Sequence, residues 1–166
     1  MPTPTVKIKL GSWFVSVYDK QAISWVMWPR VPANYVVSRG EESYVGQSGN
    51  VFLRIYQHIQ GCICNTATVI SSAGAEDDRI LRIHIEFGLM LIQLGCDKKL
   101  SSKQADIPAG GPDEKHRALD FFETVALHFE KVAPHIFGSG SDENRRAMDA
   151  GLSYLRMIWG GPAKLR

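Results

Sequence analysis

Apolar residues change their spacing once along this 166-residue chain, near residue 70. Before that point they alternate with polar residues, as at Val6, Ile8 and Leu10, which is the period of a half-buried strand. After it they recur every three or four residues, which is the period of an amphipathic helix. Strands therefore come first and helices follow, without the strand–helix alternation that builds a parallel sheet. The sequence predicts an α+β fold.

The N-terminal part is predicted to form an antiparallel β-sheet of about four to six short strands. The strand candidates are residues 6–10, 13–18, 23–27, 35–37 and 66–70. The alternation shifts its phase at Gly11, which indicates a bulge between the first two candidates. Pro29 and Pro32 end regular pairing, because proline has no N–H to donate to a neighbouring strand.

The segment from Val51 to Gln60 fits two interpretations. As a strand, it projects Phe52, Arg54, Tyr56 and His58 from one face. As a helix, it gathers an apolar stripe of Val51, Phe52, Ile55, Tyr56 and Ile59, and Gly61 would end it. We favour the strand because the neighbouring segments are rich in β-branched residues.

About three C-terminal α-helices are predicted to pack against the sheet. The first runs from about Ile80 to Leu94 and is closed by Gly95; the second starts at Pro112 and is ended by Ala133-Pro134. The third starts at Ser141 and is stopped by Gly160. We expect residues 1–166 to form a single domain, with a β-rich lobe at 1–70 and a helical lobe at 71–166.

Charge and composition exclude several classes of protein. The net charge is +2, from 19 basic and 17 acidic residues, so the whole chain does not look like a polyanion binder. Residues 1–70 are more basic, with six Lys and Arg against three Asp and Glu. Lysines interrupt the apolar positions near the N-terminus, and no stretch of about 20 residues is nearly free of charge. We therefore expect a soluble, cytoplasmic protein with no signal peptide and no membrane contact.

The three cysteines do not predict a metal site. Cys62 and Cys64 form a C-x-C pair and Cys96 stands alone, whereas a tetrahedral zinc site usually needs two chelating pairs. We expect these thiols to be small buried apolar groups, with no metal and no cofactor.

An aromatic segment broken by prolines fits two interpretations, a protein interface or ordinary packing of Trp25 and Trp28 in the core. Trp25, Met27, Trp28 and Arg30 are residue types enriched at the centres of interfaces, and the prolines would leave the segment at a sheet edge. The first hypothesis is therefore a non-catalytic binding or assembly module. Its partner would be another protein or a second copy of this chain, giving a homo-oligomer.

A second hypothesis uses the face that Val51–Gln60 would present as a strand. Phe52, Arg54, Tyr56 and His58 combine rings that stack on bases with cations that neutralise phosphate, as in proteins that bind single-stranded RNA or DNA. Phe14, Tyr18, Lys7 and Lys9 would extend this nucleic-acid surface.

The pair Arg79-x₄-His84 supplies a third hypothesis. It resembles the R-x₄₋₆-H signature of HEPN-type ribonucleases, which lies on a helix of an all-helical fold. The resemblance implies metal-independent RNA cleavage, with Arg79 binding phosphate and His84 acting as acid or base. The two residues are about 140° apart on an ideal helix, and the β-rich first half departs from that family. Other catalytic motifs are missing from the sequence, so a binding protein is expected rather than an enzyme.

Overall fold

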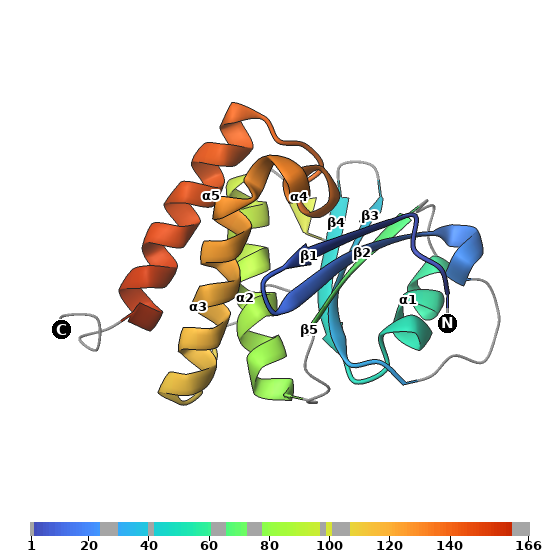
Figure 1. The fold of residues 1–166 in the computed structure, drawn as a ribbon, viewed down its shortest axis with the longest axis horizontal. Coiled ribbons are helices and arrows are strands. Elements are labelled where there is room, and N and C mark those ends of the chain that lie inside the picture. Colours follow the sequence, from blue (N-terminus) through green and yellow to red (C-terminus); the bar gives the residue numbers. More distant parts are fainter. Residues whose placement is uncertain are drawn as a thin grey trace.

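The computed structural model describes residues 2–23, 30–39, 42–60, 66–72, 78–96, 99–100 and 107–160. It has an antiparallel sheet in the N-terminal half and a group of helices in the C-terminal half, so the predicted α+β fold is confirmed (Figure 1). The strands are β1 (Val6–Leu10), β2 (Trp13–Asp19), β3 (Ala33–Arg39), β4 (Glu42–Ser48), β5 (Thr66–Ser72) and the short β6 (Lys99–Leu100).

The spatial order of the sheet is β1-β2-β5-β3-β4-β6. All neighbours are antiparallel except β4 and β6, which are parallel. Strand β5 is therefore inserted between β2 and β3, although it follows both along the chain. This insertion places β3 and β4 side by side on the half of the sheet away from the edge strand β1.

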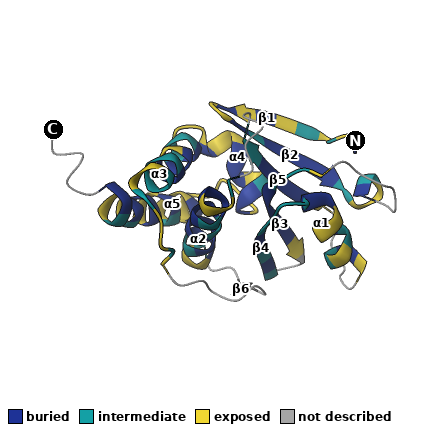
Figure 2. Ribbon diagram, turned by 90° about the horizontal axis from the view of Figure 1, so that it is seen from below, coloured by how far each residue is buried: buried dark blue, intermediate teal, exposed yellow. Residues whose placement is uncertain are grey.

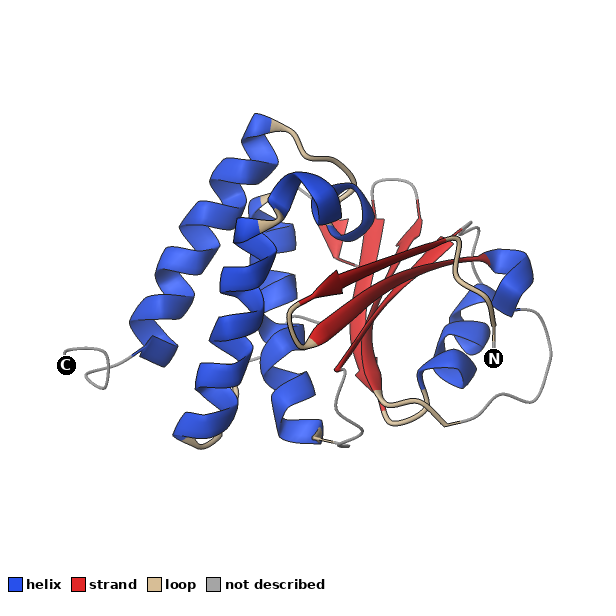
Figure 3. Ribbon diagram, viewed as in Figure 1, coloured by secondary structure: helices blue, strands red, loops and turns tan. Residues whose placement is uncertain are grey.

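Helices cover both faces of the sheet. The helices are α1 (Val51–Gln60), α2 (Arg79–Gly95), α3 (Pro112–Leu127), α4 (Phe129–Ile136) and α5 (Asp142–Leu155), with a 3₁₀ turn η1 (Lys20–Ile23) and a π turn η2 (Arg156–Gly160). Figure 3 shows α2, α3, α4 and α5 on one side of the sheet and α1 on the other. Two apolar cores result, a large one under α2–α5 and a smaller one between the sheet and α1 (Figure 2).

The smaller core sets the position of α1. Because side chains alternate along a strand, Tyr35 and Val37 of β3 point toward α1, while Val36 between them points into the larger core. Helix α1 contributes Phe52 and Ile55 to the same core, and both are fully buried.

The strand that we favoured for Val51–Gln60 is wrong, and the helical interpretation holds. Val51, Phe52, Ile55 and Ile59 are all buried, which is one face of a helix and fits no alternation. Leu53, which a strand would turn to the same side as Val51, is 45% exposed. The β-rich neighbouring segments do not determine the structure of this segment, because it packs across the face of the sheet and does not pair with its strands.

Two turn predictions also need correction. Gly11 does not form a bulge: Leu10 pairs with Trp13, so Gly11 lies in a two-residue hairpin turn, with a φ of 58° that suits glycine. Pro134 does not end the second helix, since it lies inside α4. The break comes earlier, at His128, and divides the predicted helix into α3 and α4.

The remaining helix boundaries follow their sequence signals. Helix α2 spans Arg79–Gly95, and α3 begins at Pro112, a position where the missing N–H costs nothing. Ser141 caps α5, because its hydroxyl accepts a hydrogen bond from the backbone N–H of Asn144. The strand expected at 23–27 is described only at Ile23, which belongs to η1.

Candidate functional site

A tyrosine of the sheet and a histidine of α1 meet on the α1 side of the sheet. Tyr35 is in β3 and is 1% exposed, and His58 lies near the end of α1 and is half-buried. Their atoms Oη and Nε2 are 3.0 Å apart, which is hydrogen-bond distance. This bond links the sheet to α1 through polar groups, beside the apolar contacts of the smaller core.

Two more side chains complete the group. Arg54 lies one turn before His58 on the same helix face, and it is exposed. Tyr44 of β4 lies with its ring centroid 4.2 Å from the His58 ring and 6.0 Å from the Tyr35 ring, to which it is nearly parallel. Arg54 interacts electrostatically with both tyrosines. We refer to Tyr35, Tyr44, Arg54 and His58 as the α1–β4 site.

A glycine makes room for this arrangement. Gly46 of β4 pairs directly with Tyr35 of β3. A Cβ atom at Gly46 would lie 2.6 Å from the Tyr35 hydroxyl oxygen, which is too close for any side chain. The absence of a side chain at this position therefore lets the Tyr35 ring lie over β4 and reach His58.

The surroundings of Tyr35 and His58 keep both side chains neutral. Burial raises the pKa of Tyr35 strongly, and the neighbouring Tyr44 adds to this effect while Arg54 opposes it. Burial also lowers the pKa of His58 below its ordinary value of 6.5, and the positive charge of Arg54 lowers it further. At neutral pH the Tyr35 hydroxyl is therefore protonated, the His58 imidazole is uncharged, and the Arg54 guanidinium carries a positive charge.

The most exposed residue of the α1–β4 site, Arg54, is a hydrogen-bond donor. A guanidinium carries N–H donors and no acceptor. The hydrogen-bonding partner of Arg54 on its own helix is the neutral Gln57, and within the described part of the chain no carboxylate pairs with Arg54 or His58. A guanidinium that lies beside half-exposed rings and forms no ion pair among the described residues can bind an anionic group that also has a planar, stackable part.

The structure brings together only part of the predicted nucleic-acid surface. Arg54 and His58 lie side by side as expected, but Phe52 is 1% exposed and contacts Tyr18 inside the smaller core. The prediction that Phe52 belongs to an open surface is therefore wrong. Tyr56 is half-buried against the same core.

Sequence reasoning missed Tyr35 and Tyr44 as site residues. They come from two strands whose pairing with each other, and whose position under α1, depend on contacts distant in sequence. One signal was available: Arg54 and His58 are four residues apart, which places them on one face of a helix but would also suit one face of a strand.

The predicted protein interface lies mostly outside the described residues. Trp25, Met27 and Trp28 fall in 24–29, which the structure does not describe. Arg30 is exposed and donates from Nε to the backbone oxygen of Gly49 over 3.1 Å. The interface remains a prediction.

Arg79 and His84 do not share a surface. Arg79 is exposed, whereas His84 is fully buried and its Nδ1 lies 2.8 Å from the backbone oxygen of Ile80. Its ring packs against Trp159, 5.4 Å away between centroids. Within the described residues, the buried His84 ring is therefore not placed to act on a phosphate held by Arg79.

No cluster of metal ligands occurs among the described residues. Cys96 is half-buried, and Cys62 and Cys64 lie outside the described residues. In the same part of the chain, no helix is long and apolar enough to cross a membrane.

Comparisons with protein-family models, curated proteins and solved structures gave no match. The function of the α1–β4 site is therefore inferred from its own geometry.

Proposed function

We propose that this protein is a binding module for single-stranded nucleic acid and that the α1–β4 site is its contact surface. In this proposal Arg54 holds a backbone phosphate, and the ring edges and faces of Tyr44 and His58 receive a base. Stacking of one base on an aromatic side chain contributes about 1–3 kcal/mol, and every base has a face that can stack. The site would therefore bind with little sequence preference.

The observation that carries the proposal is the exposed guanidinium of Arg54 beside two half-exposed rings, with no carboxylate pairing with it among the described residues. An arginine on a helix surface stabilises the helix when an acidic side chain lies three or four residues away. Arg145 of α5 is an example, because it lies 3.6 Å from Asp149, one turn further along the helix. Arg54 instead contacts neutral groups, which leaves its charge available for an anion.

The charge of the first seventy residues supports the same ligand. Six basic and three acidic residues give this part a net charge of +3, and the exposed Lys7 and Lys9 of β1 are among them. Lys7 lies over the Phe14 ring, 4.7 Å from its centroid, which repeats the pairing of a cation with an aromatic ring. Strand register puts Lys7, Ser16, Val69 and Tyr35 in one row on the α1 side of the sheet.

The test is fluorescence anisotropy with labelled single-stranded RNA and DNA at increasing salt. We expect affinity to fall with salt, with a slope of log K against log salt of about −0.7 for each phosphate contact. Arg54→Gln should weaken binding about tenfold, as the loss of a charge-assisted hydrogen bond predicts. Tyr44→Phe should keep the affinity, whereas Tyr44→Leu should reduce it, because only the latter removes the stacking surface.

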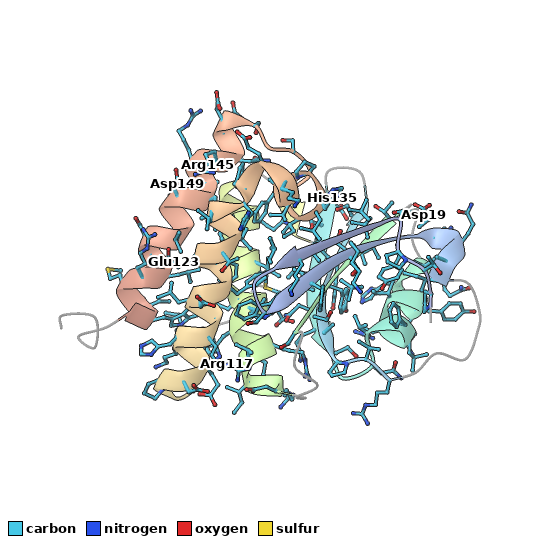
Figure 4. All side chains as sticks on the ribbon, viewed as in Figure 1. Asp19, Arg117, Glu123, His135, Arg145 and Asp149 are labelled. Atoms are coloured by element: carbon cyan, nitrogen blue, oxygen red, sulfur yellow. The ribbon has the colours of Figure 1, made fainter. Side chains whose placement is uncertain are left out.

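Arg145→Gln is the matched control. It removes an exposed arginine from α5, which lies on the opposite side of the sheet from α1 (Figure 4). The control should bind like the unmodified protein. Binding that is insensitive to salt, or equal losses in Arg54→Gln and Arg145→Gln, would contradict the proposal.

A further inference from the structure

We infer that Tyr35 is a positioning residue whose hydroxyl donates to Nε2 of His58 and thereby keeps the imidazole proton on Nδ1, so that His58 offers an N–H to a phosphate oxygen. This inference rests on the proposed function and names the anion-binding role of one of its residues. It assigns the tautomer of His58 from the contacts of Tyr35, which is itself buried beneath the contact surface.

The first step concerns the single proton of the Tyr35 hydroxyl. Among the described residues, the polar groups that interact with the phenol oxygen are Nε2 of His58, the guanidinium of Arg54 and the hydroxyl of Tyr44. Arg54 carries only donors, so it cannot accept the proton. Of the two remaining groups, the imidazole nitrogen is the more basic and is the better acceptor. The Tyr35 O–H therefore points to Nε2 of His58.

The second step concerns whether the Tyr35 hydroxyl could take another hydrogen-bond partner. Its side chain is 1% exposed, so water does not compete for the hydroxyl. The ring is held between Gly46, which leaves no space for a Cβ atom, and the nearly parallel ring of Tyr44. A buried hydroxyl without a partner would be costly, and this cost maintains the bond to His58.

The third step concerns the other nitrogen of His58. A neutral imidazole has one N–H and one bare nitrogen, and the partner of one nitrogen decides the state of the other. When Nε2 accepts from Tyr35, Nδ1 carries the proton. Among the described residues no hydrogen bond to Nδ1 is found, and the His58 side chain is only half-buried, so Nδ1 is the ring nitrogen left for a ligand.

These steps give the α1–β4 site two neighbouring donors from one helix. The guanidinium of Arg54 and Nδ1–H of His58 come from positions one turn apart, where side chains lie about 5–6 Å from each other at Cβ. Both suit the oxygens of a phosphate group, and neither requires His58 to be charged. At neutral pH the site would thus bind a phosphate with the single positive charge of Arg54 and the neutral N–H of His58.

The test reads the tautomer directly, from long-range ¹H–¹⁵N NMR spectra of the histidine rings in the unliganded protein at pH 7.5. His58→Gln assigns the signals by their loss. We expect the Nδ1–H pattern for His58 in the unmodified protein. We expect Tyr35→Phe to move it toward the Nε2–H form that free imidazole side chains prefer in water. Tyr44→Phe, which removes a hydroxyl from the same site, should leave the Nδ1–H pattern in place.

An Nε2–H pattern for His58 in the unmodified protein would overturn the inference, and His58→Gln enters this measurement only to assign the signals. The spectra contain no nucleic acid, so a failure of nucleic-acid binding would remove the proposed function and leave the tautomer assignment standing. The link between the two is tested by affinity. Tyr35→Phe should weaken binding about fivefold, and unchanged affinity with a changed tautomer would show that the Nδ1 proton does not contact the ligand.

Discussion

Asp78 joins two helices by using both of its carboxylate oxygens, one to cap α2 and one to bind Arg117 of α3. Oδ1 accepts a hydrogen bond from the backbone N–H of Leu81 over 3.0 Å, and Oδ2 lies 3.0 Å from Nη1 of Arg117. Figure 4 shows Arg117 near the end of α3 that lies beside the start of α2. The residue that caps α2 therefore also fixes the position of α2 relative to α3.

Asp78→Ala should lower the free energy of unfolding by about 1–2 kcal/mol, because the helix loses its cap and the ion pair together. Asp78→Asn keeps an oxygen for Leu81 and should cost less, and Arg117→Gln, which keeps the cap, should cost at most about 1 kcal/mol. Urea unfolding of the three variants measures these differences. Equal losses in Asp78→Asn and Asp78→Ala would show that the cap contributes nothing.

Gly46→Ala should destabilise the protein. The new Cβ would lie 2.6 Å from the Tyr35 oxygen, so the ring or the strand must move, at a cost of about 1–3 kcal/mol. Gly140→Ala is the matched control, since nothing lies within 4 Å of a Cβ there. We expect the control to be neutral or up to about 1 kcal/mol more stable. Thermal unfolding of the pair measures the difference, and similar melting temperatures would show that Tyr35 is not held tightly by β4.

The sequence was sufficient to predict the fold class because its two halves carry different periods. The first helix-sized pattern of the C-terminal half, with Asp78 before it and Gly95 at its end, is α2, and Pro112 marks the start of α3. These signals are local: a cap, a proline and a stripe each act within a few residues. Local signals also explain the error at 51–60, where an apolar pattern short enough for a strand was interpreted from its neighbours.

The α1–β4 site could be predicted only in part because half of it is made by long-range pairing. Arg54 and His58 are close in sequence and any regular structure brings them near each other. Tyr35 and Tyr44 join them only once β3 pairs with β4 and α1 crosses the sheet above them. Nothing in the local sequence states that β5 separates β2 from β3, and this insertion determines which strands lie under α1.

His58 should make stability depend on pH in the mildly acidic range. Its pKa in the folded protein is lowered from 6.5 by burial and by Arg54, so the unfolded chain takes up a proton first as pH falls. The contribution is therefore fully present above pH 6.5 and is lost as pH falls through the folded pKa. His58→Gln should lose less stability than the unmodified protein between pH 7.5 and about pH 5. The other histidines are present in both proteins, and a difference that does not change with pH would contradict the prediction.

Glu86 should make the protein less stable as pH rises, because burial raises the pKa of its carboxyl group above the ordinary value of 4.5. Glu86 is half-buried in α2, and its charged form is the one that the folded state disfavours. The favourable contribution of its protonated form is complete below pH 4.5 and is lost as pH rises through the folded pKa. Glu86→Gln should therefore raise the melting temperature at pH 7, and this gain should disappear near pH 4. Glu130→Gln, at an exposed position of α4, is the control and should show no such gain. A gain at Glu86 that persists unchanged at pH 4 would mean that glutamine packs better there and that ionisation is not the cause.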